Sequence, residues 1–258
     1  ILIQIQQTRH TLLTFLLIVI MMNLSCTYNL FIIASILALN ASAFTPDVLL
    51  ATFDGKDKAT TFTWEAKDDP VMGGSSTSNA GIKNNTLIFS GTCAIVKYLK
   101  APGFASVHTS AGQVFNSAAS AVNGSINLML RSSTPTYTGF KVAWSAKGIP
   151  IKPKYGHSDG SFKASFQLKN QTDWQVVNIP MSTFSDDWSP FSGDCSTKDP
   201  WWSGGTQHHC CGTSAAASQY CPTSTFLSAL TDLSIWAEGV AGDFHIEAKW
   251  IGASSSTI

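Results

Sequence analysis

The chain has 258 residues, with 16 basic and 16 acidic side chains, six cysteines and eight tryptophans. Only 12% of its residues are charged, against roughly 25% in an average soluble domain. Such a sparse and balanced charge excludes a large basic surface of the kind that binds nucleic acid, so we expect no nucleic-acid partner.

Residues 1–43 are predicted to form a leader for the secretory route. Residues 1–20 precede the first methionine and are interpreted as an extension that need not be translated. The apolar run at 30–39 has the length of a signal-peptide core, and small residues at 41–43 supply a cleavage site. We therefore expect a cleaved signal peptide and no membrane span after cleavage. The alternative is a membrane anchor, because most of the leader holds no charged side chain.

The expected location is the secretory pathway or the cell exterior. The plastid is an alternative, because the run from Ala41 to Phe44 resembles the ASAF-type motif of plastid proteins that enter by the secretory route. A mitochondrial location is less favoured, since the leader lacks the basic residues of a mitochondrial presequence. Sequons begin at Asn84, Asn123 and Asn170, and they predict glycosylation in the secretory lumen.

Residues 44–258 are predicted to form one all-β domain. Apolar and polar residues alternate along short stretches, which is the pattern of strands with one face packed inward and one facing water. In chain order we expect strands at 48–53, 62–66, 86–89, 94–99, 104–108, 126–130, 140–144, 162–168, 174–179, 233–237 and 244–250. Many short strands without a helical period favour a jelly-roll β-sandwich.

A cysteine-rich loop insertion is predicted at residues 186–224, where the alternation stops and Gly, Ser, Cys and Trp accumulate. Its cysteines are Cys195, Cys210, Cys211 and Cys221. In an exported chain they favour two disulfides over a zinc site, because adjacent cysteines are poorly placed to bind one ion, and we expect no metal. A bond between neighbours is strained, so Cys195 and Cys221 should each pair with one of the other two.

The segment from Trp64 to Ser75 reads Trp-Glu-Ala-Lys-Asp-Asp-Pro-Val-Met-Gly-Gly-Ser. It resembles the signature of the complex I intermediate-associated protein 30 (CIA30) family. Later segments resemble that family in the same order, at 87–91, 103–107, 162–166, 174–180 and 233–247. The resemblance spans residues 48–252 and implies a galactose-binding-domain-like jelly roll. It also implies a non-enzymatic assembly factor for mitochondrial complex I that binds incomplete or unfolded subunits. The uncharged leader and the insertion depart from this family pattern.

The first candidate binding site lies within that signature and comprises Asp69, Met72, Gly73, Gly74 and Ser75. Paired glycines permit a tight turn, and acidic side chains can hydrogen-bond the amides of such a turn. We interpret the segment as a structural turn that leads into a strand. The alternative is a rim that holds a partner or a glycan.

The second candidate site comprises the loop tryptophans Trp188, Trp201 and Trp202, whose rings suit sugar faces or protein hot spots, or else cover a sheet edge. The sequence contains no zinc-protease motif or dinucleotide fingerprint, so we expect neither an enzyme nor a cofactor. The favoured function is a binding module for protein clients, of the assembly or chaperone type. The alternative is a secreted carbohydrate-binding module that binds a glycan.

Overall fold

The computed structural model of the protein describes residues 44–110, 112–150 and 160–256. The chain divides into two compact units, Ile1–Thr45 and Pro46–Ile258, and every element described below belongs to the second unit. The expected leader, residues 1–43, lies outside the described residues, so the signal peptide stays a prediction. Among the described residues, no helix is long and apolar enough to cross a membrane.

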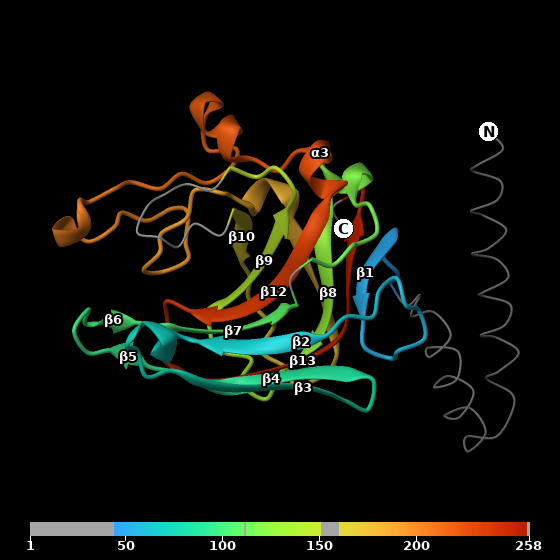
Figure 1. The fold of residues 1–258 in the computed structure, drawn as a ribbon, viewed down its shortest axis with the longest axis horizontal. Coiled ribbons are helices and arrows are strands. Elements are labelled where there is room, and N and C mark those ends of the chain that lie inside the picture. The colour runs from blue at the N-terminus through green and yellow to red at the C-terminus, as the bar shows by residue number, and fades with distance from the viewer. Residues whose placement is uncertain (1–43, 111, 151–159, 257–258) are drawn as a thin grey trace, which may run out of the picture. The chain divides into compact units, whose positions relative to one another are not determined.

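Two antiparallel sheets build a β-sandwich (Figure 1). Across the described residues, sheet A has the strand order β11 (Gln175–Pro180), β8 (Ser125–Arg131), β13 (Gly242–Ser254), β4 (Thr86–Cys93) and β3 (Thr77–Lys83), with β1 (Val48–Thr52) beside β13. Sheet B has the order β10 (Ser161–Ser165), β9 (Phe140–Ala146), β12 (Leu230–Glu238), β7 (Phe104–Thr109) and β2 (Trp64–Asp68). The expected all-β, jelly-roll β-sandwich is confirmed.

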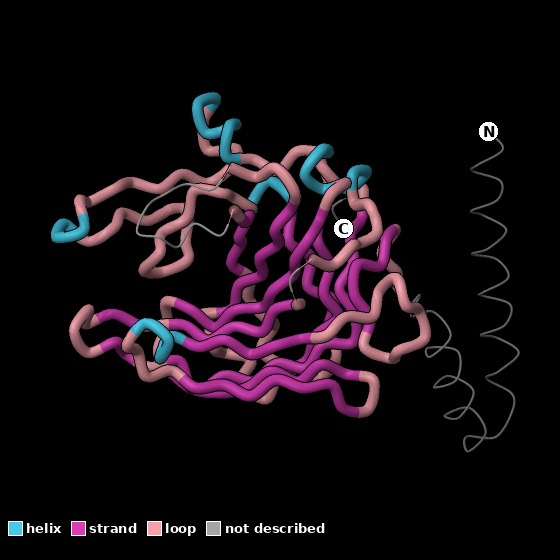
Figure 2. Tube along the Cα trace, in the orientation of Figure 1, coloured by secondary structure: helices cyan, strands magenta, loops and turns pink. Residues whose placement is uncertain are grey.

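In the described part of the chain, the helices are short and lie in the connections between strands (Figure 2). They are η1 (Asp69–Met72), η2 (Ala119–Ala121), η3 (Met181–Thr183), η4 (Trp201–Ser203), η5 (Ala215–Tyr220) and α3 (Ser224–Leu227). A small hairpin outside both sheets pairs β5 (Ile95–Val96) with β6 (Ala101–Pro102). This hairpin replaces the longer strand that was expected at 94–99, whereas β3 was not expected from its sequence.

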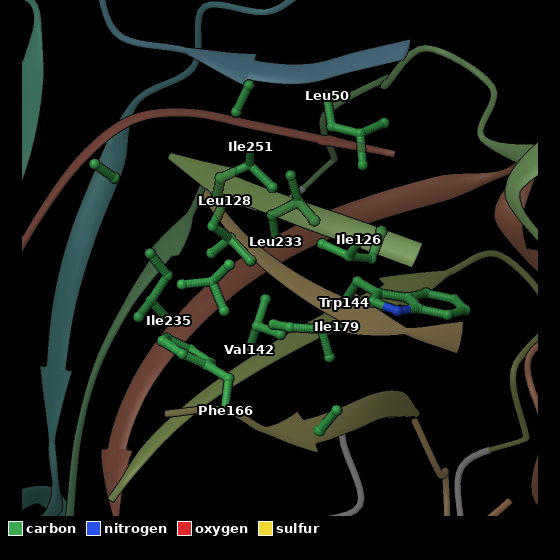
Figure 3. Close-up of a cluster of buried hydrophobic side chains, with 14 of the residues drawn as sticks. Leu50, Ile126, Leu128, Val142, Trp144, Phe166, Ile179, Leu233, Ile235 and Ile251 are labelled. Atoms are coloured by element: carbon green, nitrogen blue, oxygen red, sulfur yellow. The ribbon is translucent and has the colours of Figure 1, made fainter. Parts of the chain in front are cut away.

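The core lies between the sheets, where alternate residues of each strand meet (Figure 3). In β8, Ile126 and Leu128 are fully buried, and in β9 the same holds for Val142 and Trp144. Ile235 of β12 pairs in register with Val142, so the strands present a continuous apolar layer. Each such side chain stabilises the fold by about 1.5–3 kcal/mol through burial, which explains why the period-2 pattern determines the fold.

The outer face of sheet B differs from the sequence-based expectation of a face in contact with water. Lys141 of β9 and Lys163 of β10 alternate with core positions and point away from the core, yet they are 2% and 1% exposed. The expectation is wrong here because the insertion packs across β10, β9 and β12. Sheet B is therefore covered on both faces along these strands.

Candidate functional site

The signature segment surrounds a buried carboxylate. Asp69, the first residue of η1, is 3% exposed. Its carboxylate accepts hydrogen bonds from the Ser76 amide (2.8 Å), the Ser76 hydroxyl (2.8 Å) and the Phe104 amide (3.1 Å). A Cβ atom at Gly74 or at Gly103 would overlap this carboxylate. The glycines and the serine of the signature are therefore the residue types that allow a carboxylate to be enclosed here.

The same segment joins the two sheets at a corner. It leaves β2 of sheet B through η1, which is capped by Gly73 with a φ of 83°, and it enters β3 of sheet A. Asp68 fixes the start of β3, because its carboxylate accepts a 2.8 Å hydrogen bond from the Ser78 amide. This geometry corresponds to the structural turn that we favoured from the sequence. Gly73 and Ser75 lie exposed on it, and the Met72 side chain lies outside the described residues.

Next to this corner is a cleft of about 60 Å3, enclosed by the β5–β6 hairpin, by β7 and by the start of the insertion. Its walls are mainly apolar and include Val96, Tyr98, Leu99, Phe104, Pro190 and Phe191. The acidic residues that line it are Asp69 and Glu238. Both are already engaged, the first by hydrogen bonds and the second by an ion pair described next. The cleft therefore offers apolar contact with little unused hydrogen-bonding capacity.

A buried lysine fastens the insertion to sheet B. Lys163 Nζ lies 2.8 Å from Glu238 Oε2 and 3.8 Å from the ring centroids of both Trp188 and Trp236. Trp188 also donates a 3.0 Å hydrogen bond from its ring nitrogen to the carbonyl of Ser161. Trp188, a candidate binding residue from the sequence, therefore contacts the sheet rather than standing at the free surface. This arrangement corresponds to the alternative in which a loop tryptophan covers the sheet.

A second ion pair lies beside the first. Lys141 Nζ is 3.1 Å from Asp194 Oδ1, which also accepts a 2.7 Å hydrogen bond from the Ser165 hydroxyl. Gly193 adopts a φ of +71°, and a Cβ there would overlap the Glu238 carboxylate. The insertion thus approaches the sheet closely enough that only a glycine fits.

Disulfides hold the two sides of the insertion together. Within the described part of the chain they join Cys195 to Cys210 and Cys211 to Cys221, one of the two pairings that the sequence left open. Cys93 is a buried free thiol, and burial raises the pKa of this thiol to about 11. The disulfides indicate an oxidising compartment, as in secreted and extracellular proteins.

A buried histidine adds a polar brace within the insertion. His208 is 4% exposed, with Nδ1 2.9 Å from Asp187 Oδ1 and Nε2 3.0 Å from Asp199 Oδ1. Burial opposes the charged ring, but the two carboxylates outweigh burial and raise the pKa of His208. Burial likewise acts to raise the pKa of Asp187, and hydrogen bonds from His208 and His209 outweigh it and lower that pKa. The insertion is therefore braced by charge as well as by disulfides.

The tip of the insertion presents two tryptophans. Trp201 and Trp202 lie in η4, and they are 88% and 49% exposed. Trp202 contacts Phe191 edge-on with ring centroids 5.2 Å apart, and Phe191 in turn lines the cleft. Tyr98, which is 66% exposed, stands on the hairpin across that cleft. We call Tyr98, Phe191, Trp201 and Trp202 the aromatic rim, and in Figure 1 the hairpin and the orange insertion extend to the same side.

The sequence identified Trp201 and Trp202 as candidates, whereas it gave no role to Tyr98 or Phe104. These two residues enter the site only because the hairpin and β7 lie next to the insertion. The expected glycosylation positions Asn84, Asn123 and Asn170 are all exposed in turns or bends, and their modification stays a prediction. The described residues contain no group of three or more His, Cys, Asp or Glu side chains that could hold a metal.

The fold and the site define a class of protein, an antiparallel jelly-roll β-sandwich with a disulfide-braced insertion. A model of the family described as complex I intermediate-associated protein 30 (CIA30) matches residues 51–193. The chain belongs to the CIA30 family. Trp201 and Trp202 follow the matched residues, so family membership assigns them no role. No protein with a curated description matches the sequence.

Several solved structures resemble the chain at low similarity. PfGH50B is 11% identical with a TM-score of 0.41, and the match covers 77% of this chain and 23% of that one. The agarase AgWH50C is 10% identical with a TM-score of 0.42, over 80% and 26%. A family 11 carbohydrate-binding module from Clostridium thermocellum is 12% identical with a TM-score of 0.36, over 81% and 98%. The chain thus spans about a quarter of the first two proteins, and likenesses this weak carry no argument about ligands.

Proposed function

We propose that the protein is a non-enzymatic binding module that holds protein partners at the aromatic rim and the adjoining cleft. The observation that carries this proposal is the exposure of large aromatic rings on a support braced by disulfides and buried ion pairs. Exposing such rings to water is unfavourable unless they contact a partner. Tryptophan and tyrosine also dominate the binding energy at protein interfaces.

The chemistry of the cleft favours a protein partner. Sugars are held by polar groups that hydrogen-bond their hydroxyls as well as by aromatic faces. Asp69 and Glu238 are both engaged within the protein, so the cleft has few such groups to offer. Apolar walls instead suit the hydrophobic side chains of a protein segment. The CIA30 family takes its name from association with intermediates of complex I, and client binding by this chain is in keeping with that name.

The same engagement of the acidic residues supports a non-enzymatic role. General acid–base catalysis needs a carboxyl group that can reach a substrate and exchange a proton with it. Asp69 accepts three hydrogen bonds from its own chain, and Glu238 contacts a buried lysine. Neither group is placed to exchange protons with a bound molecule.

The test is capture of partners by the purified, disulfide-bonded chain from an extract of its source cells. A Trp201→Ala/Trp202→Ala variant should lose defined proteins that the unsubstituted chain retains, because it removes the exposed rings. Ile82→Ala, at an apolar residue of β3 that is 46% exposed, is the matched control and should retain them. Each captured protein is then purified and its binding reconstituted. Equal capture by both variants, or no reconstituted binding, would contradict the proposal.

A second function is favoured by the high exposure of Trp201, since an open indole face also stacks on a sugar ring. A carbohydrate-binding module predicts retention on specific glycans in an array. Trp201→Ala should abolish this retention. Glycan binding that survives Trp201→Ala would remove the insertion tip from this second function.

A further inference from the structure

Three exposed lysines accompany the aromatic rim. Lys97 and Lys100 flank Tyr98 in the turn of the β5–β6 hairpin, and Lys198 precedes η4 in the insertion. The Lys198 side chain lies close to Gly205, which is also close to the backbone of Trp201. The hairpin beside the cleft therefore carries an exposed aromatic ring and positive charge, and the tip of the insertion carries both as well.

No acidic group of the cleft neutralises these lysines. Asp69 and Glu238 are 3% and 4% exposed, and each is satisfied by its own contacts. Asp199, next in sequence to Lys198, is also 3% exposed and faces His208. Among the described residues, Lys97, Lys100 and Lys198 make no ion pair. The rim thus combines aromatic surface with uncompensated positive charge.

The backbone at one of these lysines gives an independent indication. Lys100 has a φ of 51°, in the left-handed region that glycine and asparagine adopt more readily. A lysine at such a position is strained, and strained positions concentrate where a side chain has a binding or switching role. The hairpin holds this lysine beside the cleft at the expense of local backbone stability.

We infer that the rim binds an acidic protein segment that carries aliphatic or aromatic side chains. This inference rests on the proposed function and specifies the chemistry of the partner. Carboxylates of the segment pair with the lysines, and its apolar side chains fill the cleft and contact the rings. An acidic polysaccharide would satisfy the lysines, but it has no hydrophobic side chain for an apolar cleft.

The probe is a fluorescein-labelled peptide in which Glu alternates with Leu and Phe, compared with peptides that carry Gln or Lys in place of Glu. Binding to the full chain is measured by fluorescence anisotropy. At about 0.05 M salt the Glu peptide should bind about tenfold tighter than the Gln peptide. The difference should disappear near 1 M salt, where the Debye length is about 3 Å.

Charge reversal locates the effect. The triple variant Lys97→Glu/Lys100→Glu/Lys198→Glu should remove the preference for the Glu peptide. The control triple variant reverses the same number of charges at other exposed lysines, namely Lys58, Lys83 and Lys147, and should keep the preference. An unchanged unfolding midpoint shows that both variants are folded.

The outcomes separate this inference from the proposed function. If the Glu and Gln peptides bind equally and both need Trp201 and Trp202, acidic specificity is wrong and the binding rim stands. If no peptide binds, or if alginate binds with tryptophan dependence while the peptides do not, the inference is overturned. A preference for the Glu peptide that persists in the rim triple variant overturns it as well.

Discussion

The buried ion pair beneath the insertion gives the sharpest prediction. Lys163→Met keeps the length of the side chain and removes its charge, which leaves Glu238 buried without its partner. The side chains of Lys163 and Glu238 are 0% and 5% exposed, so water cannot replace the lost contact. Removing one member of such a pair costs about 3–5 kcal/mol in the free energy of unfolding. The cation also leaves the two tryptophan rings that enclose it, which adds to the loss.

Replacing both members should cost much less than replacing one. In Lys163→Met/Glu238→Met no charge stays buried, and methionine packs well against indole rings. We therefore expect the double variant to recover at least half of the stability that Lys163→Met loses. Urea unfolding with the disulfides intact measures this, with tryptophan fluorescence and far-UV circular dichroism as probes. A loss of about 4 kcal/mol lowers the midpoint by between about 1 and 2 M urea for a domain of this size.

The matched control is Lys249→Met on sheet A. Lys249 is exposed, and its Nζ lies 4.4 Å from the ring centroid of Trp174. Because water solvates this cation, the change should stay within about 0.5 kcal/mol. The reasoning is refuted if Lys163→Met is as mild as this control. It is also refuted if the double variant is at least as unstable as Lys163→Met.

Three further predictions concern the signature, the histidine brace and the disulfides. Gly103→Ala places a methyl group against the buried carboxylate of Asp69 and should lower the free energy of unfolding by about 2 kcal/mol or more, measured by thermal unfolding. The control Gly81→Ala, whose Cβ would meet nothing within 4 Å, should lower it far less. Equal effects of the two changes would contradict the packing argument. His208 has a raised pKa in the fold, so its contribution to the free energy of unfolding is complete below its unfolded pKa of about 6.5 and is lost as pH rises through the raised pKa. Urea unfolding of the wild-type protein at successive pH values should show this fall in stability. A His208→Gln variant with the same dependence on pH would count against the argument. The Cys195–Cys210 disulfide joins residues 15 positions apart, so its reduction should lower the free energy of unfolding by about 3 kcal/mol. Trypsin should then cut the insertion before it cuts the sandwich. Cleavage of both at the same time would contradict the view that the disulfide stabilises the insertion separately.

The strands that the sequence predicted are those in which apolar residues alternate with other residue types. The expected strand at 140–144 lies inside β9, and the one at 244–250 lies inside β13, because each supplies an apolar residue at every second position. β3 escaped prediction because it lies at the edge of sheet A and is largely exposed. The stretch at 94–99 looked like a strand, but it turns after Val96 into a backbone that places Lys100 in the left-handed region.

The candidate site was only partly accessible from the sequence. Cysteine spacing predicted the braced insertion, and the tryptophans in it pointed to its tip. The partner of Lys163 could not be found this way, since Glu238 lies 75 residues away and just beyond the strand expected at 233–237. Asp69 was expected to bond the amides of its own turn, yet it also binds the amide of Phe104, 35 residues later. Such contacts depend on which loop covers which strand, and local patterns do not encode that.

The face of sheet B that the insertion covers is mostly polar, and this affects how far the sandwich depends on the insertion. The outward residues of the covered strands are mostly polar, among them Ser161, Lys163, Ser165, Lys141 and Ser234. If the insertion were removed, water would solvate these polar groups, and Trp236 would be the large aromatic side chain uncovered beside them. The hydrophobic core is formed mainly by residues of the strands, so the insertion can change in length while that interior stays unchanged.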